Sequence, residues 1–155
     1  MLALAEDDVW VVGTGSDSQP ITAHWDGDTW LSYGLPGADN GLGSLAALSP
    51  GHLWAGGWLR GGEVVAEWNG GTWRVRGRSY WIPDVAVRQT EVWAILNDVV
   101  ARWNGSKWIP LEKRHPDIAL MGLAVDRSGD VWAAGYWLGE APKQRSVVYR
   151  YRCAK

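Results

Sequence analysis

The sequence is poor in several features that would assign a chain to a particular class of protein. It has one cysteine, Cys153, in 155 residues, so no internal disulfide framework forms, and no sequence-coupled base makes that thiol a nucleophile. A formal net charge of -2 gives no electrostatic reason to expect a nucleic-acid or anionic membrane partner. No apolar run approaches the roughly 20 residues that a membrane-spanning helix needs.

Phenylalanine is absent, and the large aromatic residues are instead 13 Trp and 5 Tyr. No segment has the 3.6-residue period of an amphipathic helix. No basic segment followed by an apolar one marks a signal peptide, so the sequence assigns no compartment. At this length the chain can bury a core of its own, and we expect a single domain over residues 1–155.

What the sequence contains instead is a repeated unit, clearest in the stretch from Gly51 to Gly77. Runs rich in Val and Trp flank Asn69-Gly70, and such a pair between strand-like runs is a strong hairpin signal. The first Trp of the unit recurs at residues 10, 54, 93 and 132, which are 44, 39 and 39 residues apart. A period of about 40 residues with four strands per unit is typical of β-propeller blades.

Four units follow from this period, at about residues 1–34, 35–77, 78–113 and 114–155. A second aromatic position falls at residues 25, 68 and 103, with Tyr149 in the fourth unit, and a third at residues 30, 73 and 108. The fourth unit stops after the strand Val147–Tyr151, so it lacks its outer strand. We therefore expect an all-β fold of four blades, in which Trp54, Trp93 and Trp132 pack between neighbouring blades.

The pattern resembles bacterial Trp-rich β-propeller repeats, in which Val-Trp-Ala-x-Gly precedes Trp-Asp/Asn-Gly-x-x-Trp. Residues 131–135 read Val-Trp-Ala-Ala-Gly, and residues 68–73 read Trp-Asn-Gly-Gly-Thr-Trp. Kelch-like and sugar-binding lectin propellers are the nearest groups, whereas the spacing differs from that of Asp-box and WD40 repeats. The resemblance covers essentially the whole chain and implies an architecture, but it carries no set of catalytic residues with it.

The two ends of such blades differ in regularity. At one end the turns are short, and polar residues stand two positions before each first Trp. We interpret these as solvated turn residues: Asp8, His52, Glu91 and Asp130. At the other end the connections vary in length, and aromatic and ionisable residues outside the repeat gather there. These are the candidate site residues: Asp39, Trp58, Trp81, Asp84, His115, Asp117 and Trp137.

Three functions remain open for this irregular end. A carbohydrate or other small molecule could bind with its apolar faces stacked on the ligand-binding candidates Trp58, Trp81 and Trp137. A hydrolase acting on an ester, lactone or phosphoester could use the catalytic candidates, holding a divalent cation that activates water: His115, Asp117, Asp39 and Asp84. A protein-interaction scaffold is the third alternative. Instead of contacting a ligand, Trp58, Trp81 and Trp137 could equally be structural residues that cap the blades.

The incomplete fourth unit also leads to a prediction about assembly. A propeller protects its sheet edges by closing into a ring of about 4–8 blades. The unpaired outer side of Val147–Tyr151 therefore invites a partner, and we expect a homodimer in which two half-propellers complete one ring or pair through terminal strands. The missing outer strand of the fourth unit is also compatible with the chain being a piece of a longer, exported repeat protein.

Overall fold

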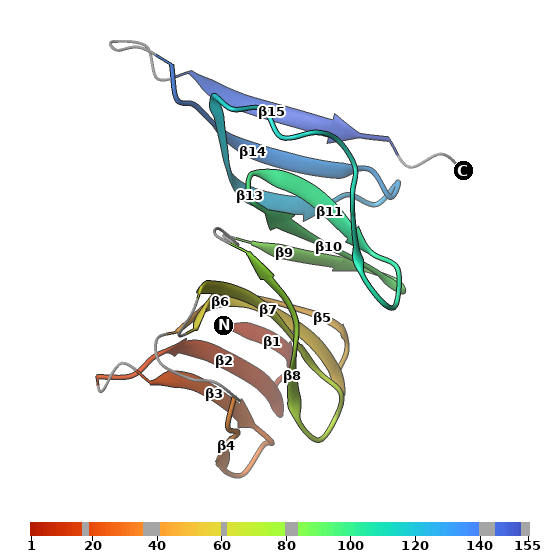
Figure 1. Ribbon diagram of the computed structural model, residues 1–155. Helices are drawn as coiled ribbons and strands as arrows, with labels where there is room; N and C mark the ends of the chain where they lie inside the picture. The colour runs from red at the N-terminus through yellow and green to blue at the C-terminus, as the bar shows by residue number, and fades with distance from the viewer. Residues whose placement is uncertain (17–18, 36–40, 60–61, 80–83, 140–144, 153–155) are drawn as a thin grey trace.

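The computed structural model describes residues 1–16, 19–35, 41–59, 62–79, 84–139 and 145–152. These residues form four antiparallel sheets, which follow one another from the N-terminal end to the C-terminal end of the molecule (Figure 1). The described segments contain no helix, which confirms the all-β prediction. It follows that they contain no helix long and apolar enough to cross a membrane.

Each sheet is built from strands that are consecutive in the sequence. Sheet 1 consists of β1 (Leu2–Ala5), β2 (Asp8–Thr14), β3 (Pro20–Trp25) and β4 (Trp30–Ser32). Sheet 2 consists of β5 (Leu42–Ser49), β6 (His52–Leu59), β7 (Gly62–Trp68) and β8 (Trp73–Ser79). Sheet 3 consists of β9 (Val85–Arg88), β10 (Glu91–Leu96), β11 (Val99–Trp103) and β12 (Trp108–Pro110).

Sheet 4 has three strands, β13 (Ile118–Val125), β14 (Val131–Trp137) and β15 (Ser146–Tyr151). The strand β15 is therefore an edge strand among the described residues, as the sequence predicted. Its register corrects one expectation: Val131 of β14 pairs with Tyr151, as Val9 of β2 pairs with Trp25. Tyr151 and not Tyr149 thus occupies the second aromatic position, because the register between β14 and β15, and not the spacing in the sequence, sets which residue faces Val131.

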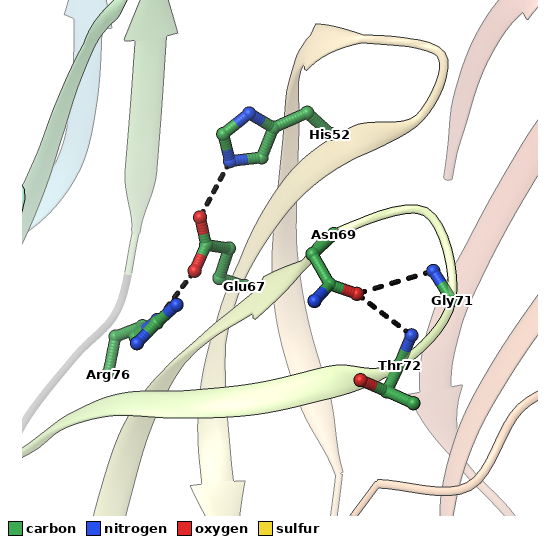
Figure 2. A network of polar contacts seen from close by, with 6 residues as sticks. All are labelled: His52, Glu67, Asn69, Gly71, Thr72 and Arg76. Carbon is green, nitrogen blue, oxygen red and sulfur yellow. Dashed lines mark hydrogen bonds and ion pairs between the residues drawn. The ribbon is translucent and has the colours of Figure 1, made fainter.

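The hairpins between the third and fourth strands of sheets 1 to 3 share one turn chemistry. In sheet 2 the side-chain oxygen of Asn69 accepts hydrogen bonds from the backbone N–H groups of Gly71 and Thr72, at 3.3 and 3.0 Å (Figure 2). Gly70 has φ = 88°, a left-handed conformation that glycine adopts without strain. The Asn-Gly signal in the sequence therefore predicted these turns correctly.

The hydrophobic core lies between successive sheets. Between sheets 1 and 2, Trp10 of β2 lies against Trp68 and Trp73, with ring centroids 5.3 and 6.4 Å apart. These aromatic contacts are tilted or edge-on, which are the favoured geometries for such pairs. One Trp from the second strand of sheet 1 is thus enclosed by the outer aromatic pair of sheet 2.

The same arrangement joins the following sheets. Trp54 of β6 lies 5.6 Å from Trp103 and 5.7 Å from Trp108 of sheet 3, again between ring centroids. Trp93 of β10 packs in a third cluster, in which sheet 4 contributes Tyr149 and Tyr151 among its partly buried members. Three interfaces therefore hold the four sheets together, and in the first two an aromatic pair of the following sheet encloses the Trp.

The predicted packing of the first-position Trp residues holds for two of the three. Trp54 and Trp93 are 1% and 0% exposed, whereas Trp132 of sheet 4 is 36% exposed. The expectation for Trp132 was wrong, because burial of this position depends on a following sheet, and none of the described sheets lies there. Trp58 and Trp137, placed in loops by the sequence, are in fact strand residues, paired with Glu63 and Ile118.

We expect Trp93→Ala to lower the free energy of unfolding by about 3–5 kcal/mol, because it removes a fully buried indole from the interface between sheets 3 and 4. The matched control is Trp58→Ala, since Trp58 is also on a strand but is 52% exposed, and it should cost less than about 1 kcal/mol. Urea titration followed by circular dichroism measures both. Equal losses in the two variants would contradict the role assigned to the interface.

Candidate functional site

The strand order gives every sheet two different ends. The connections from first to second and from third to fourth strand lie at one end, which we call the turn end. The connections from second to third strand and the links between sheets lie at the other, which we call the loop end. The sequence placed all candidate site residues at the loop end. Two of them, Asp39 and Trp81, lie outside the described residues.

The structure brings three of the candidates together where β13 begins and β14 ends. The ring of His115 lies 5.0 Å from that of Trp137, and His115 Nδ1 accepts a hydrogen bond of 3.3 Å from the backbone N–H of Asp117. The backbone oxygen of Asp117 in turn accepts from the N–H of Leu138 at 2.7 Å. Trp137 is half-buried against the core of sheet 4, so its ring has a packing role as well.

Asp84 has a different role from the one that the sequence suggested. Its carboxylate accepts hydrogen bonds from the backbone N–H groups of Val85 at 2.9 Å and Leu123 at 2.8 Å. It therefore ties the start of β9 to β13 of the next sheet, and both of its oxygens are used in doing so. The described residues contain no group of three or more His, Cys, Asp or Glu side chains that could hold a metal ion.

Trp58 is the candidate with the most accessible side chain, with 52% of its surface exposed near the end of β6. Its backbone is fixed, because its N–H donates a 2.8 Å hydrogen bond to the oxygen of Gly41. The indole therefore stands on a rigid strand at the loop end. Such a side chain offers an aromatic surface to a ligand at little cost in ordering.

A cavity that the sequence did not indicate lies at the loop end of sheet 3. It has a volume of about 540 Å³, within the size range of small-molecule sites. The register of sheet 3 pairs Leu96 with Val99 and Ala101 with Pro110, so these side chains share one face. They form the apolar wall together with Trp108, while the rim is polar and consists of Asn97, Glu112, Lys113 and Arg114.

Neighbouring groups hold part of this polar rim in place. Arg114 donates to the carboxylate of Asp98 at 3.1 Å, and Asp98 also accepts from the backbone N–H of Leu120 at 3.3 Å. Glu112 accepts a hydrogen bond from the hydroxyl of Tyr151 in sheet 4. Charged groups fixed in this way lose little freedom when a ligand binds. The cavity thus combines an apolar wall with donors and an acceptor at its mouth.

The sequence carried a partial signal for this cavity. The link after β12 was recognised as irregular, but His115 and Asp117 were selected from it, whereas Glu112, Lys113 and Arg114 line the cavity. The sequence signal for the rim was the negative charge of Glu112 next to the positive charges of Lys113 and Arg114. The apolar wall gave none, because Trp108 and Ala101 also satisfy the repeat and are explained by packing.

The turn end is more regular than the sequence suggested. In every sheet the residue two positions before the first Trp forms an ion pair or hydrogen bond with a residue of the third strand. These cross-strand polar pairs, with their closest distances, are Asp8–His24 (2.9 Å), His52–Glu67 (2.7 Å), Glu91–Arg102 (3.1 Å) and Asp130–Arg150 (2.5 Å). The sequence interpretation of these positions as polar turn residues missed their partners on the third strand.

Sheet 2 reverses the order of the two partners, because its histidine is on the second strand and its carboxylate on the third. Figure 2 shows Glu67 between His52 and Arg76, and Arg76 Nε donates to Glu67 at 2.5 Å. In sheet 1 the order is opposite, and the ring of His24 is also stacked on Trp10 at 4.3 Å. In sheets 1, 2 and 4 one member of the pair lies against the first Trp. His24 is stacked on Trp10, the ring of His52 lies 6.3 Å from that of Trp54, and the guanidinium of Arg150 lies 5.1 Å from the ring of Trp132.

This reversal allows a charge-swap test. We expect His24→Glu to lower the free energy of unfolding by about 1–3 kcal/mol, because it places two carboxylates side by side. The double variant Asp8→His/His24→Glu reproduces the order found in sheet 2 and should recover most of that loss. Chemical denaturation at pH 7 measures both variants. A double variant no more stable than the single one would show that the pair is not coupled.

A second prediction concerns the pH dependence of stability. Burial raises the pKa of Asp84 above its usual 3.8, against the opposing effect of the Leu123 and Val85 amides. A raised folded-state pKa means that the stabilising contribution is complete below pH 3.8 and is lost as the pH rises through the folded pKa. The stability difference between the protein and Asp84→Asn should fall over that interval. Carbon-13 NMR titration with a midpoint at or below 3.8 would contradict this.

Comparison with known proteins identifies a fold and no family. No protein-family model matches the sequence, and no curated protein is significantly similar to it. Among solved structures, the chain is similar in fold to PorZ, described as an essential bacterial surface component of the type-IX secretion system of Porphyromonas gingivalis. The TM-score is 0.65 over 94% of this chain at 14% identity, and the chain spans about 24% of PorZ. At that identity the likeness shows the fold alone.

Proposed function

We propose that the four sheets are blades of a β-propeller and that the chain is a ligand-binding module whose ligand is a carbohydrate. The observation that carries the proposal is the cavity of about 540 Å³ at the loop end of sheet 3. Its wall is apolar and includes Trp108, while charged side chains stand at its mouth. A sugar presents C–H surfaces and hydroxyl groups together, so it matches such a lining.

The charged residues at the rim would supply the hydrogen bonds to hydroxyl groups. Arg114 is held by Asp98, and Glu112 by Tyr151, so both groups are positioned before a ligand arrives. Lys113, which lies between them in the sequence, is exposed and adds a flexible donor. Hydrogen bonds to charged groups contribute about 1.5–3 kcal/mol each, so their loss should be measurable in binding.

The exposed Trp58 supports the same class of ligand from a neighbouring position at the loop end of sheet 2, since an aromatic face stacks on sugar C–H groups. The hydrolase alternative has no comparable support. His115 and Asp117 do lie together, but Asp84 is engaged by two backbone amides. Binding without turnover is thus the function that these contacts favour.

The test is a glycan array, with a panel of esterase and phosphoesterase substrates run beside it, followed by calorimetric titration of the glycans retained. We expect Lys113→Ala or Arg114→Ala to weaken binding about tenfold or more, because each removes a charged donor from the rim. The matched controls are Lys107→Ala and Arg74→Ala, which remove the same charges at exposed positions outside the cavity. These controls should bind as the unchanged protein does.

Two results would contradict the proposal in different ways. If Trp58→Ala abolishes binding while Lys113→Ala and Arg114→Ala leave it unchanged, the site is at β6 and not in the cavity of sheet 3. If no glycan is retained and a substrate in the panel is turned over, the hydrolase alternative replaces carbohydrate binding.

A further inference from the structure

Every sheet has one face toward the sheet that follows it, the exit face, and one toward the sheet that precedes it, the entry face. The exit face carries the first Trp of the repeat. It also carries the third-strand residue that stands two positions before the partner in the cross-strand polar pair, as Thr22 stands before His24. In sheets 1 to 3 these positions are at most 2% exposed, and they hold Trp10, Trp54 and Trp93, with Thr22, Val65 and Val100. The exit face is therefore a fully buried surface wherever another sheet covers it.

The exit face of sheet 4 has the same composition but is exposed. Trp132 occupies the Trp position and is 36% exposed. Val148 occupies the second position, because it pairs with Ala134 as Val100 pairs with Ile95, and it is 65% exposed. A valine that is fully buried in sheets 2 and 3 is thus in contact with solvent in sheet 4.

The entry face of sheet 1 is also exposed, although the same positions are buried in sheet 2. Trp30 is 53% exposed, whereas Trp73 at the same place in sheet 2 is 1% exposed. Ile21 is 42% exposed, whereas its counterpart Val64 is fully buried. Trp30 and Trp25 also have the geometry of the pair Trp68 and Trp73, which encloses a Trp of the preceding sheet. The ring centroids are 5.8 Å apart in both pairs.

We propose that a second copy of this chain binds head-to-tail, with the exit face of its sheet 4 on the entry face of sheet 1. Within the chain, Trp54 inserts against the pair Trp103 and Trp108, and Trp132 of one copy would insert in the same way against Trp25 and Trp30 of the other. The two exposed faces are the two halves of an interface that the chain already forms twice, between sheets 1 and 2 and between sheets 2 and 3. Because the two faces complement each other, the chemistry of the surface favours another copy as the occupant.

The geometry also limits the size of the assembly. An interface between two different faces closes into a ring only when the rotation between copies allows it. Two copies of four sheets give eight, which is the upper end of the usual range for propellers, and both exposed faces of each copy are then covered. Because the residues that line the cavity of sheet 3 lie outside the exit face of sheet 4 and the entry face of sheet 1, this inference does not depend on the proposed ligand.

The first test is the mass of the unchanged protein at micromolar concentration, by light scattering or sedimentation. We expect a particle of two 17.1 kDa chains. Val148→Glu and Trp30→Glu should each give the mass of one chain, because each places a carboxylate at the centre of an apolar contact and raises the Kd about thirtyfold or more. Both residues are exposed, so the fold should persist, as circular dichroism will verify.

Controls and a mixing experiment distinguish this interface from others. Trp58→Glu introduces the same charge at an exposed apolar position of sheet 2, outside the two faces, and should remain dimeric. Val148→Glu keeps an intact entry face and Trp30→Glu an intact exit face, so a mixture of the two should form a one-to-one heterodimer in native mass spectrometry. A single-chain mass for the unchanged protein overturns the proposal. So does a dimer that survives Trp30→Glu, since it would point to pairing between β15 edges.

Discussion

The packing of one tryptophan per sheet against the next sheet is the interaction on which the rest of the structure depends. The indole N–H groups of Trp10, Trp54 and Trp93 have no acceptor among the described residues, which costs about 1–3 kcal/mol for each. Each ring buries about 150–250 Å² of surface, which at about 25 cal/mol per Å² contributes about 4–6 kcal/mol. The free energy gained by burying the rings therefore exceeds the cost of the unpaired N–H groups. Close packing of apolar surface holds the sheets together.

This arrangement separates the two ends of the sheets. At the turn end, short hairpins and the cross-strand polar pairs recur from sheet to sheet, because they border the buried Trp. At the loop end the connections are free to differ. In sheet 3 the connection between β10 and β11 is only Asn97-Asp98, both with positive φ, as a tight two-residue turn requires. The cavity lies beside this turn, since Asn97 and its neighbours Leu96 and Val99 line it.

Much of the fold could be predicted from the sequence, because the signals that specify it are local. The regular recurrence of Trp located the second strands, and the pairs such as Asn69-Gly70 located the hairpins. Less of the candidate site could be predicted. His115, Asp117 and Trp137 were correctly grouped at one end of the sheets, but the cavity was missed, since its wall is made of residues that the repeat already explained.

The sequence by itself determined the order of the strands and the hairpins that join them in sheets 1 to 3, since both follow from turn chemistry and alternation. The register of β15 was decided by its pairing with β14. Only the tertiary structure decided which of these residues are buried. Trp93 and Trp132 have the same place in the repeat, yet one is enclosed and the other exposed, because burial depends on the adjacent sheet. The role of Asp84 was decided there as well, since the amide of Leu123 that engages it lies 39 residues away in the chain.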